Sequence, residues 1–167
     1  YTGIAIPAII PMIAITIAIS MREKPFWVYI VVSSLSTGAI LVPSRERMNR
    51  RLTMLMSILT SVKDINNVTV YFGVDEDDPT RDMIKKVARA IPCVKIVDIK
   101  NDKKFIGLGK MWNLCVDASD EEIISMIGDD MVFKTPGWDE MIIKEFEAGP
   151  TDGIYAVHCN DDCHGEK

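Results

Sequence analysis

Short and nearly continuous apolar runs recur along the chain, each typical of a strand that is buried on both faces of a parallel sheet. The runs are residues 39–42, 68–74, 94–99, 123–127 and 154–158. Between most of them, apolar residues recur at the spacing of amphipathic helices. Strands alternating with helices predict an α/β domain, and the first three strands form a β-α-β-α-β unit.

Two helices are predicted directly after the first two strands. Ser44 can cap the first one, and the expected apolar side is Met48, Leu52, Leu55 and Leu59. Asp78 is the predicted N-cap of the second helix, which runs from Pro79 to about Ile91. The expected buried side of that helix is Met83, Ile84, Val87, Ala88 and Ile91.

Two further helices are predicted from glycine, proline and acidic residues. Gly107 and Gly109 border the start of one, and its packed side is Leu108, Met111, Trp112 and Cys115. The other begins at about Pro136, with Thr135 as its N-cap. Its first turn carries Asp139 and Glu140, which suit the positive end of the helix dipole. Its apolar side is Trp138, Ile142 and Phe146.

Two adjacent carboxylates follow the apolar run 123–127, because the chain continues as Gly128, Asp129 and Asp130. The carboxyl end of a buried strand lies in the crevice where open α/β sheets bind ligands. Hard oxygen ligands grouped there suit Mg²⁺ or Mn²⁺, which typically takes its remaining ligands from water and substrate phosphates. A simple turn made by the two aspartates is the alternative interpretation.

Other polar residues fall at the ends of the predicted strands. Arg45 follows the first strand, where it could meet a phosphate or a base, and Asp75 follows the second as the expected ligand-facing acid. The remaining charged neighbours are expected to be solvated surface, and these are Arg47, Arg50, Arg51, Glu76 and Asp77.

The start of the third predicted helix carries a further candidate pair. Lys110 and Asn113 are three residues apart and so share one helix face. A glycine-bordered helix start with a lysine is a reasonable phosphate-facing element, although the G-x-G pattern alone is common.

Composition narrows the class of protein. With 167 residues, of which 48% are hydrophobic, the chain can bury one ordinary core. The net charge of -5 argues against nonspecific nucleic-acid binding. The four cysteines show no disulfide framework, and Cys93 and Cys115 fall in apolar patterns. Core thiols indicate a reducing compartment, so the expected location is cytoplasmic.

The first 20 residues carry no charge and are about long enough to cross a bilayer. Pro7 and Pro11 lie within them, and no basic residue precedes them. They are either a membrane anchor, which would place the protein on the cytoplasmic face of a membrane, or upstream sequence outside the working domain. The expected division is an apolar segment at residues 1–37 and a domain at residues 38–167.

Four motifs in a fixed order resemble a known family. They are PSRER after the first strand, GVDEDDP after the second, GLGKMWN at a helix start, and IGDDM followed by TPGWDEMI. Together they resemble the family 2 glycosyltransferases, closest to phage and viral members, over roughly Gly38 to the end of the chain. The resemblance implies the GT-A fold, a Rossmann-like three-layer α/β/α sandwich of nucleotide-diphospho-sugar transferases with a mostly parallel sheet.

The resemblance assigns the nucleotide side of a donor site. Pro43, Ser44 and Arg45 match the turn that lies against the nucleotide base. Asp75 matches the acid that contacts the base or the ribose.

The resemblance also assigns the diphosphate side. Lys110 and Asn113 match the helix start near the diphosphate. Asp130 matches the final acid of the family's DxD signature, which ligates Mn²⁺ or Mg²⁺, and Asp129 beside it faces ribose or metal. Gly128 stands where a strict DxD carries its first acid, and this departure bears on the ribose contact more than on the metal.

The implied activity is transfer of a sugar from a nucleotide-diphospho-sugar to a hydroxyl of a glycan, lipid or protein, with inversion. Such a reaction needs a general base, for which Asp161, Asp162 and Glu166 are weak candidates. The family's acceptor half is expected to be largely missing, so the fold would be incomplete at the C-terminus. A catalytically incomplete nucleotide-sugar-binding module is the alternative function. Residues 158–164 also contain two histidines and two cysteines, so a zinc site is the alternative to the polar loop expected there.

Overall fold

A single mixed sheet forms the centre of the protein. The computed structural model describes residues 27–30, 37–100, 106–149 and 156–158. The strands are β1 (Trp27–Ile30), β2 (Gly38–Pro43), β3 (Val68–Asp75), β4 (Val94–Ile99), β5 (Ile123–Met126) and β6 (Ala156–His158). Their order in the sheet is β4-β3-β2-β5-β1-β6.

The parallel part of the sheet confirms the prediction from the apolar runs. Strands β4, β3, β2 and β5 are parallel neighbours, and β2 lies between β3 and β5 with Ile40 opposite both Val70 and Ser125. Strands β2, β3 and β4 are thus the predicted β-α-β-α-β unit.

Strand β1 runs antiparallel to its two neighbours, β5 and β6, from Trp27 opposite Met126 to Ile30 opposite Ile123. It lies inside the apolar segment 1–37 that the sequence analysis set apart from the domain, so a boundary at residue 38 leaves one strand of the sheet out.

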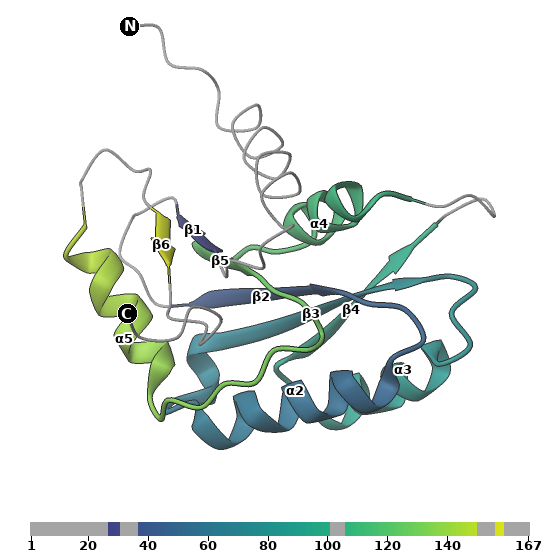
Figure 1. The fold of residues 1–167 in the computed structure, drawn as a ribbon, viewed down its shortest axis with the longest axis horizontal. Helices are drawn as coiled ribbons and strands as arrows, with labels where there is room; N and C mark the ends of the chain where they lie inside the picture. Colours follow the sequence, from purple (N-terminus) through teal and green to yellow (C-terminus); the bar gives the residue numbers. More distant parts are fainter. Residues whose placement is uncertain (1–26, 31–36, 101–105, 150–155, 159–167) are drawn as a thin grey trace, which may run out of the picture.

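Helices cover both faces of the sheet (Figure 1). They are α2 (Met48–Ser61), α3 (Arg81–Ala90), α4 (Leu108–Asp117) and α5 (Trp138–Glu147), with a short 3₁₀ turn, η2, at Ile65–Asn67. Helices α2, α3 and α5 share the larger apolar cluster on one face, and α4 packs against β2 and β3 on the other face. This is the expected three-layer arrangement. None of the helices in the described ranges is both long and apolar enough to span a bilayer.

The buried faces of the helices differ from the predicted ones in part. Met48 and Leu55 are buried as expected, but the centre of the α2 face is Met54 and Ile58, while Leu52 and Leu59 are only partly buried. Met83 and Leu108 were predicted to be buried and are instead 54% and 39% exposed. Helix propensity and apolar spacing predict where a helix forms better than which of its faces is buried. The buried face depends on the side chains of the sheet against which the helix packs.

The α4 layer is packed closely against the sheet at Gly73. A Cβ atom added there would lie 2.8 Å from the Cys115 sulfur and 3.0 Å from Ile99 Cδ1. Cys115 is fully buried, and burial raises the pKa of its thiol to about 12. Cys93 is partly buried, and both are free thiols, which agrees with the core role predicted for them.

Helix α4 begins at Leu108, between the two predicted glycines, but the other three helices begin later than their cap residues predicted. Helix α2 begins at Met48, and Ser44 does not cap it. Helix α3 begins at Arg81 and α5 at Trp138, each two residues after the predicted proline. The N-cap of α5 is Gly137, at φ +70°, where a glycine avoids the strain that a side chain would bring.

Asp139 has a different role from the one predicted from the helix dipole. It is 2% exposed, and its carboxylate accepts hydrogen bonds from the backbone N–H groups of Lys63 and Asp64 at 2.8 and 3.0 Å. Burial alone would raise the pKa of this carboxyl, but these hydrogen bonds outweigh it and lower the pKa. Asp139 therefore joins α5 to the loop that follows α2.

Candidate functional site

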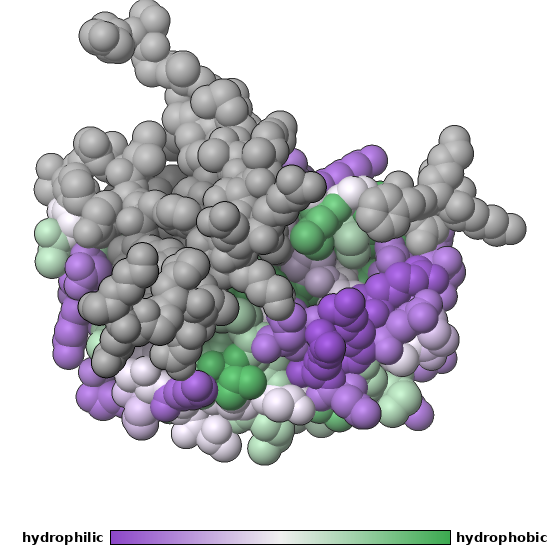
Figure 2. Space-filling model, in the orientation of Figure 1, coloured by the Kyte–Doolittle hydropathy of each residue, from purple (hydrophilic) through white to green (hydrophobic). Residues whose placement is uncertain are grey.

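Polar side chains from three strand ends meet at the carboxyl edge of the sheet. Ser44 follows β2, Asp75 ends β3, and Asp129 lies three residues after β5. All three are buried, with exposures of 6%, 8% and 5%. Figure 2 shows a strongly hydrophilic surface beside them, where α2 and α3 begin. The crevice expected at this edge is thus lined by charged and hydroxyl groups.

Arg51, which the sequence analysis assigned to solvated surface, is fully buried at the centre of this site. Its guanidinium donates to Asp78 Oδ2 at 2.7 Å, to Thr80 Oγ1 at 2.8 Å and to Ser44 Oγ at 3.0 Å. It also donates to the backbone carbonyl of Ser44. Because a buried charge needs a partner, the pairing with Asp78 explains how an arginine can occupy the core side of α2.

Asp78 is the buried counter-ion of Arg51. Its other oxygen, Oδ1, accepts from the backbone N–H and the hydroxyl of Thr80, both at 2.7 Å. Burial alone would raise the pKa of Asp78, but the hydrogen bonds from Arg51, Thr80 and the Glu46 backbone outweigh it and hold the pKa at about 2. Asp78 is therefore ionised at every physiological pH.

The turn between β2 and α2 is held in an uncommon conformation. Glu46 has φ 60°, in the left-handed region that side chains other than glycine rarely adopt. Its backbone N–H donates to Asp78 Oδ2 at 3.1 Å, so the buried pair fixes this turn. Arg45 projects from the same turn and bonds Asp77 Oδ1 at 2.5 Å and Asp75 Oδ2 at 3.2 Å. Asp77, predicted to be a solvated loop residue, therefore shares Arg45 with Asp75.

The two candidate metal ligands have different surroundings. Asp129 accepts from the Ser44 hydroxyl through Oδ2 and from Arg47 through Oδ1 at 3.2 Å. Asp130 is exposed, and its Oδ2 lies 3.7 Å from Arg50 NH1. Arg47 and Arg50 are solvent-exposed, as predicted, but both are also ion-paired with the carboxylates.

The segment after β5 follows helix α2 along its length (Figure 1). Its first residues meet Arg47 and Arg50. Further along, the Phe133 N–H donates to Ser57 Oγ at 3.0 Å, and the Gly137 N–H donates to the Ser61 carbonyl at 2.7 Å. Helix α2 therefore positions the whole segment that carries the two aspartates.

A divalent ion fits the chemistry of this site through few protein ligands. Within the described part of the chain, no three His, Cys, Asp or Glu side chains are grouped as a complete metal cage. Mg²⁺ and Mn²⁺ sites at phosphates need only one or two carboxylates. Asp130 carries an exposed carboxylate close to the strand end, whereas Asp129 is only 5% exposed. Asp130 is therefore the more accessible ligand of the two.

Gly128, where a strict DxD would carry an acid, lies directly beneath Asp130. A Cβ added to Gly128 would be 2.7 Å from Asp130 Oδ1. The missing acid thus lets the Asp130 carboxylate fold over the backbone, and a side chain at this position would push that carboxylate elsewhere.

The remaining predicted residues are less closely tied to the site. Pro43 is the last residue of β2 and is buried. Lys110 is exposed on α4, and the Asn113 amide oxygen is buried without a hydrogen-bond partner among the described residues. Neither makes a hydrogen bond to the residues of α2 or β5 in that part of the chain, because α4 lies on the opposite face of the sheet (Figure 1).

Several predictions fall outside the described residues. The base candidates Asp161, Asp162 and Glu166, the cysteines and second histidine of the weighed zinc site, and the apolar segment 1–20 all lie there. They stay predictions.

Sequence reasoning missed Arg51, Arg47 and Arg50 as site residues. A signal for Arg51 was present, because it lies three residues after Met48 and four before Leu55, on the buried side of α2. The pairing of Arg47 and Arg50 with Asp129 and Asp130 had no local signal, since 82 positions separate Arg47 from Asp129.

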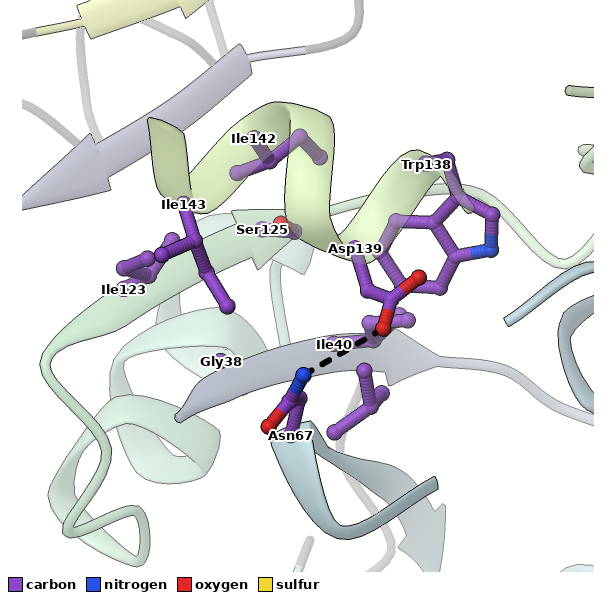
Figure 3. A pocket seen from close by; sticks show the side chains of 10 residues that line it. Gly38, Ile40, Asn67, Ile123, Ser125, Trp138, Asp139, Ile142 and Ile143 are labelled. Carbon is purple, nitrogen blue, oxygen red and sulfur yellow. Dashed lines mark hydrogen bonds between the residues drawn. The ribbon is translucent and has the colours of Figure 1, made fainter. Parts of the chain in front are cut away.

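A small cavity lies at the opposite edge of the sheet, between the strand starts and α5 (Figure 3). It measures about 20 Å³, room for about one water molecule. Its lining is mostly apolar, with Asp139 hydrogen-bonded to Asn67 at 3.4 Å beside it. It is far too small for a nucleotide, so the group of polar side chains at the carboxyl edge is the candidate site.

The mixed α/β sheet, with buried polar side chains at its carboxyl edge, is similar to solved structures that give the type of fold. The structure of TarS 1-349 from S. aureus in complex with UDP is similar with a TM-score of 0.56 at 14% identity, over 66% of this chain and 32% of that chain. A mannosyltransferase from Pyrobaculum calidifontis, PcManGT, in complex with GDP-Man and Mn²⁺, has a TM-score of 0.56 at 16% identity, over 87% of this chain and 42% of that chain. The fold is that of GT-A glycosyltransferases.

The family is shown by sequence. The profile of the family Glycosyl transferase family 2 matches residues 40–163, and the chain belongs to this family. A search of curated proteins gave no significant match. The chain spans 20% to 42% of the length of the solved structures named here and of full-length S. aureus TarS.

Proposed function

We propose that this protein transfers a sugar from a nucleotide-diphospho-sugar to an acceptor hydroxyl, with Mn²⁺ or Mg²⁺ held at Asp130. The observation that carries the proposal is the convergence of Ser44, Arg45, Asp75, Asp129 and Asp130 at the carboxyl edge of the sheet. Family membership and the two neighbours bound to UDP or to GDP-Man with Mn²⁺ support it.

Each strand end has a role in this proposal. The turn Pro43–Arg45 and Asp75 contact the base and ribose, with Arg45 held against Asp75 at 3.2 Å. Asp129 is fixed by the Ser44 hydroxyl and orients the segment that presents Asp130. Lys110 and Asn113 approach the diphosphate from the α4 side of the crevice.

When bound, the ion stabilises the negative charge that develops on the departing diphosphate. The protein's own contribution is to hold the donor between Arg45 and Asp130 and to keep Arg47 and Arg50 beside the two carboxylates. Inversion also requires a base that deprotonates the acceptor hydroxyl, for which Asp161, Asp162 and Glu166 are the candidates. The acceptor is a glycan, a lipid or a protein.

A thermal-shift panel tests the donor site. The purified chain is melted with UDP, GDP, CDP and dTDP, each with and without Mn²⁺. A ligand at a hundred times its dissociation constant should stabilise the fold by about 2.7 kcal/mol. We expect one nucleotide to stabilise only with Mn²⁺, and Asp130→Ala to abolish that shift.

The matched control is Asp117→Ala, which removes an exposed acid from the last residue of α4 and should keep the shift. A folded chain that responds to none of the four nucleotides would refute the donor site. Release of free sugar or transfer from the matching nucleotide sugar then separates a transferase from a module that only binds.

A further inference from the structure

We propose that Arg47 and Arg50 are the diphosphate-binding residues of this site, and that they exchange partners when the donor binds. In the structure their guanidinium groups pair with Asp129 and Asp130. As a divalent ion takes the carboxylate of Asp130, the two arginines turn to the diphosphate oxygens. The inference rests on the proposed function and adds two residues to it.

The geometry places both arginines at one point of the crevice. Arg47 is the N-cap residue of α2, and Arg50 lies one helical turn further on, so both project from the same side. Arg47 NH1 is 3.2 Å from Asp129 Oδ1, and Arg50 NH1 is 3.7 Å from Asp130 Oδ2. A diphosphate bound to an ion at Asp130 would therefore lie within reach of both arginines.

Exposure makes these contacts exchangeable. The side chains of Arg47 and Arg50 are 57% and 55% exposed, whereas that of Arg51 on the same turn is 0% exposed. The Arg50–Asp130 pair is open to solvent on both partners, so breaking it loses little stability. Asp129 is buried, but it keeps its hydrogen bond from the Ser44 hydroxyl when Arg47 leaves. Arginine's planar fork then gains two parallel hydrogen bonds to phosphate oxygens.

The other two arginines of the motif are already committed. Arg51 forms a buried ion pair with Asp78, and Arg45 is ion-paired with Asp75 and Asp77. Arg47 and Arg50 are therefore the most exposed arginines of the group, and each is paired with one carboxylate among the described residues.

The balance of charges predicts whether metal and diphosphate help or hinder each other's binding. Two arginines now neutralise two carboxylates. A divalent ion arriving alone meets repulsion from both guanidinium groups, while a diphosphate arriving with the ion supplies the negative charge they need. Metal and diphosphate should therefore bind cooperatively, each raising the affinity for the other by the same factor.

The test compares Arg47→Ala/Arg50→Ala with the wild-type chain by calorimetry. Three ligands are titrated separately. They are Mn²⁺ alone, the nucleoside diphosphate that binds best, and the corresponding nucleoside monophosphate, the last two in the presence of Mn²⁺. We expect the double variant to bind the diphosphate about tenfold or more weakly, which corresponds to about 1.4 kcal/mol. The monophosphate should change less, and Mn²⁺ alone should bind about threefold more tightly.

The control is Arg89→Ala, which removes an exposed arginine from the last turn of α3, at the opposite edge of the sheet. It should alter none of the three affinities. Arg47→Lys/Arg50→Lys should bind the diphosphate more tightly than the double alanine variant but less tightly than the wild type. Lysine keeps the positive charge but cannot form the two parallel hydrogen bonds of a guanidinium group. If the double variant does not fold, Arg50→Ala carries the same test.

The double variant should bind Mn²⁺ more tightly and the diphosphate more weakly. A purely structural role of the two arginines would not change the two affinities in opposite directions. Equal losses for diphosphate and monophosphate, or unchanged affinities, would overturn the exchange while leaving the donor site intact. If the wild-type chain binds no nucleotide with Mn²⁺, both the proposed function and this inference are wrong.

Discussion

The first turn of α2 and the residue before it carry two arginine–carboxylate groups that differ in their access to water. Arg51 and Asp78 are joined at 2.7 Å with both side chains fully buried. Arg47 and Arg50 meet Asp129 and Asp130 at 3.2 and 3.7 Å with more than half of each arginine exposed. The same chemistry therefore appears once as part of the core and once as part of an open site.

The comparison separates the buried pair, which fixes the shape of the site, from the outer arginines, which can exchange their partners. A buried pair cannot lose one partner without leaving an uncompensated charge, so Arg51 and Asp78 hold the turn at Glu46 and the hydroxyl of Ser44 in one arrangement. An exposed pair has water as an alternative partner, so the outer arginines can change contacts. Ser44 connects the two groups, because it accepts from Arg51 and donates to Asp129.

The largest expected effect comes from breaking the buried pair. Arg51→Met should lower the free energy of unfolding by about 3–5 kcal/mol, because it leaves Asp78 charged and buried. Urea denaturation measures the change, and Arg51→Met/Asp78→Leu should recover much of it. A single variant as stable as the wild type would mean that Arg51 is not part of the core.

Removing the connecting hydroxyl should have the next largest effect. Ser44→Ala leaves both Arg51 and Asp129 short of a partner, and hydrogen bonds to charged groups contribute about 1.5–3 kcal/mol. We expect a loss of about 2–3 kcal/mol by the same measurement.

Ser57→Ala is the matched control, because it removes a hydroxyl that bonds only backbone groups, the Phe133 N–H and the Met54 carbonyl. It should lose about 1 kcal/mol. Equal losses in the two variants would argue against a special connection at Ser44.

The depressed pKa of Asp78 predicts a pH dependence of stability. Its pKa is about 2 in the folded state, below the ordinary value of 3.8, so ionised Asp78 stabilises the fold above pH 4. This contribution, roughly 2 kcal/mol, should be lost as the pH falls from about 4 to 2. Denaturation at several pH values should show this loss in the wild type, and Asp78→Asn should remove its share of the slope.

The exposed pairs should give the smallest effect. Arg50→Ala should change the free energy of unfolding by less than about 0.5 kcal/mol, since exposed pairs contribute little. Salt near 1 M should reduce even this difference, because the Debye length is then only about 3 Å. A loss above about 2 kcal/mol would show that the outer pair is part of the core and would remove the contrast.

Local sequence signals gave the parallel strands and the end of α3 reliably. The apolar runs identified β2 to β5, and α3 ends at Ala90, one residue before the predicted end. The starts of α2, α3 and α5 were placed too early, because a bend at residues 45–46 and turns at residues 79–80 and 136–137 precede these helices.

The candidate site was predictable where position along a strand decides it. Ser44, Arg45, Asp75, Asp129 and Asp130 follow strand ends, and parallel strands bring such residues to one edge. Arg51 was assigned to the surface because a charged residue next to other arginines is usually solvated. Its burial depends on Asp78, which is 27 positions away and approaches only when β2 and β3 pair.

By itself, the sequence determined the parallel strands and the residues at their ends, because these depend on local spacing, and its ordered motifs indicated the family. Only the tertiary structure decided which arginine is buried, which carboxylate it neutralises and which pairs remain open to solvent. The physical reason is that ionic pairing and desolvation depend on distances between segments that are far apart in the chain, and the packing of α2 against the sheet and along the segment after β5 sets those distances.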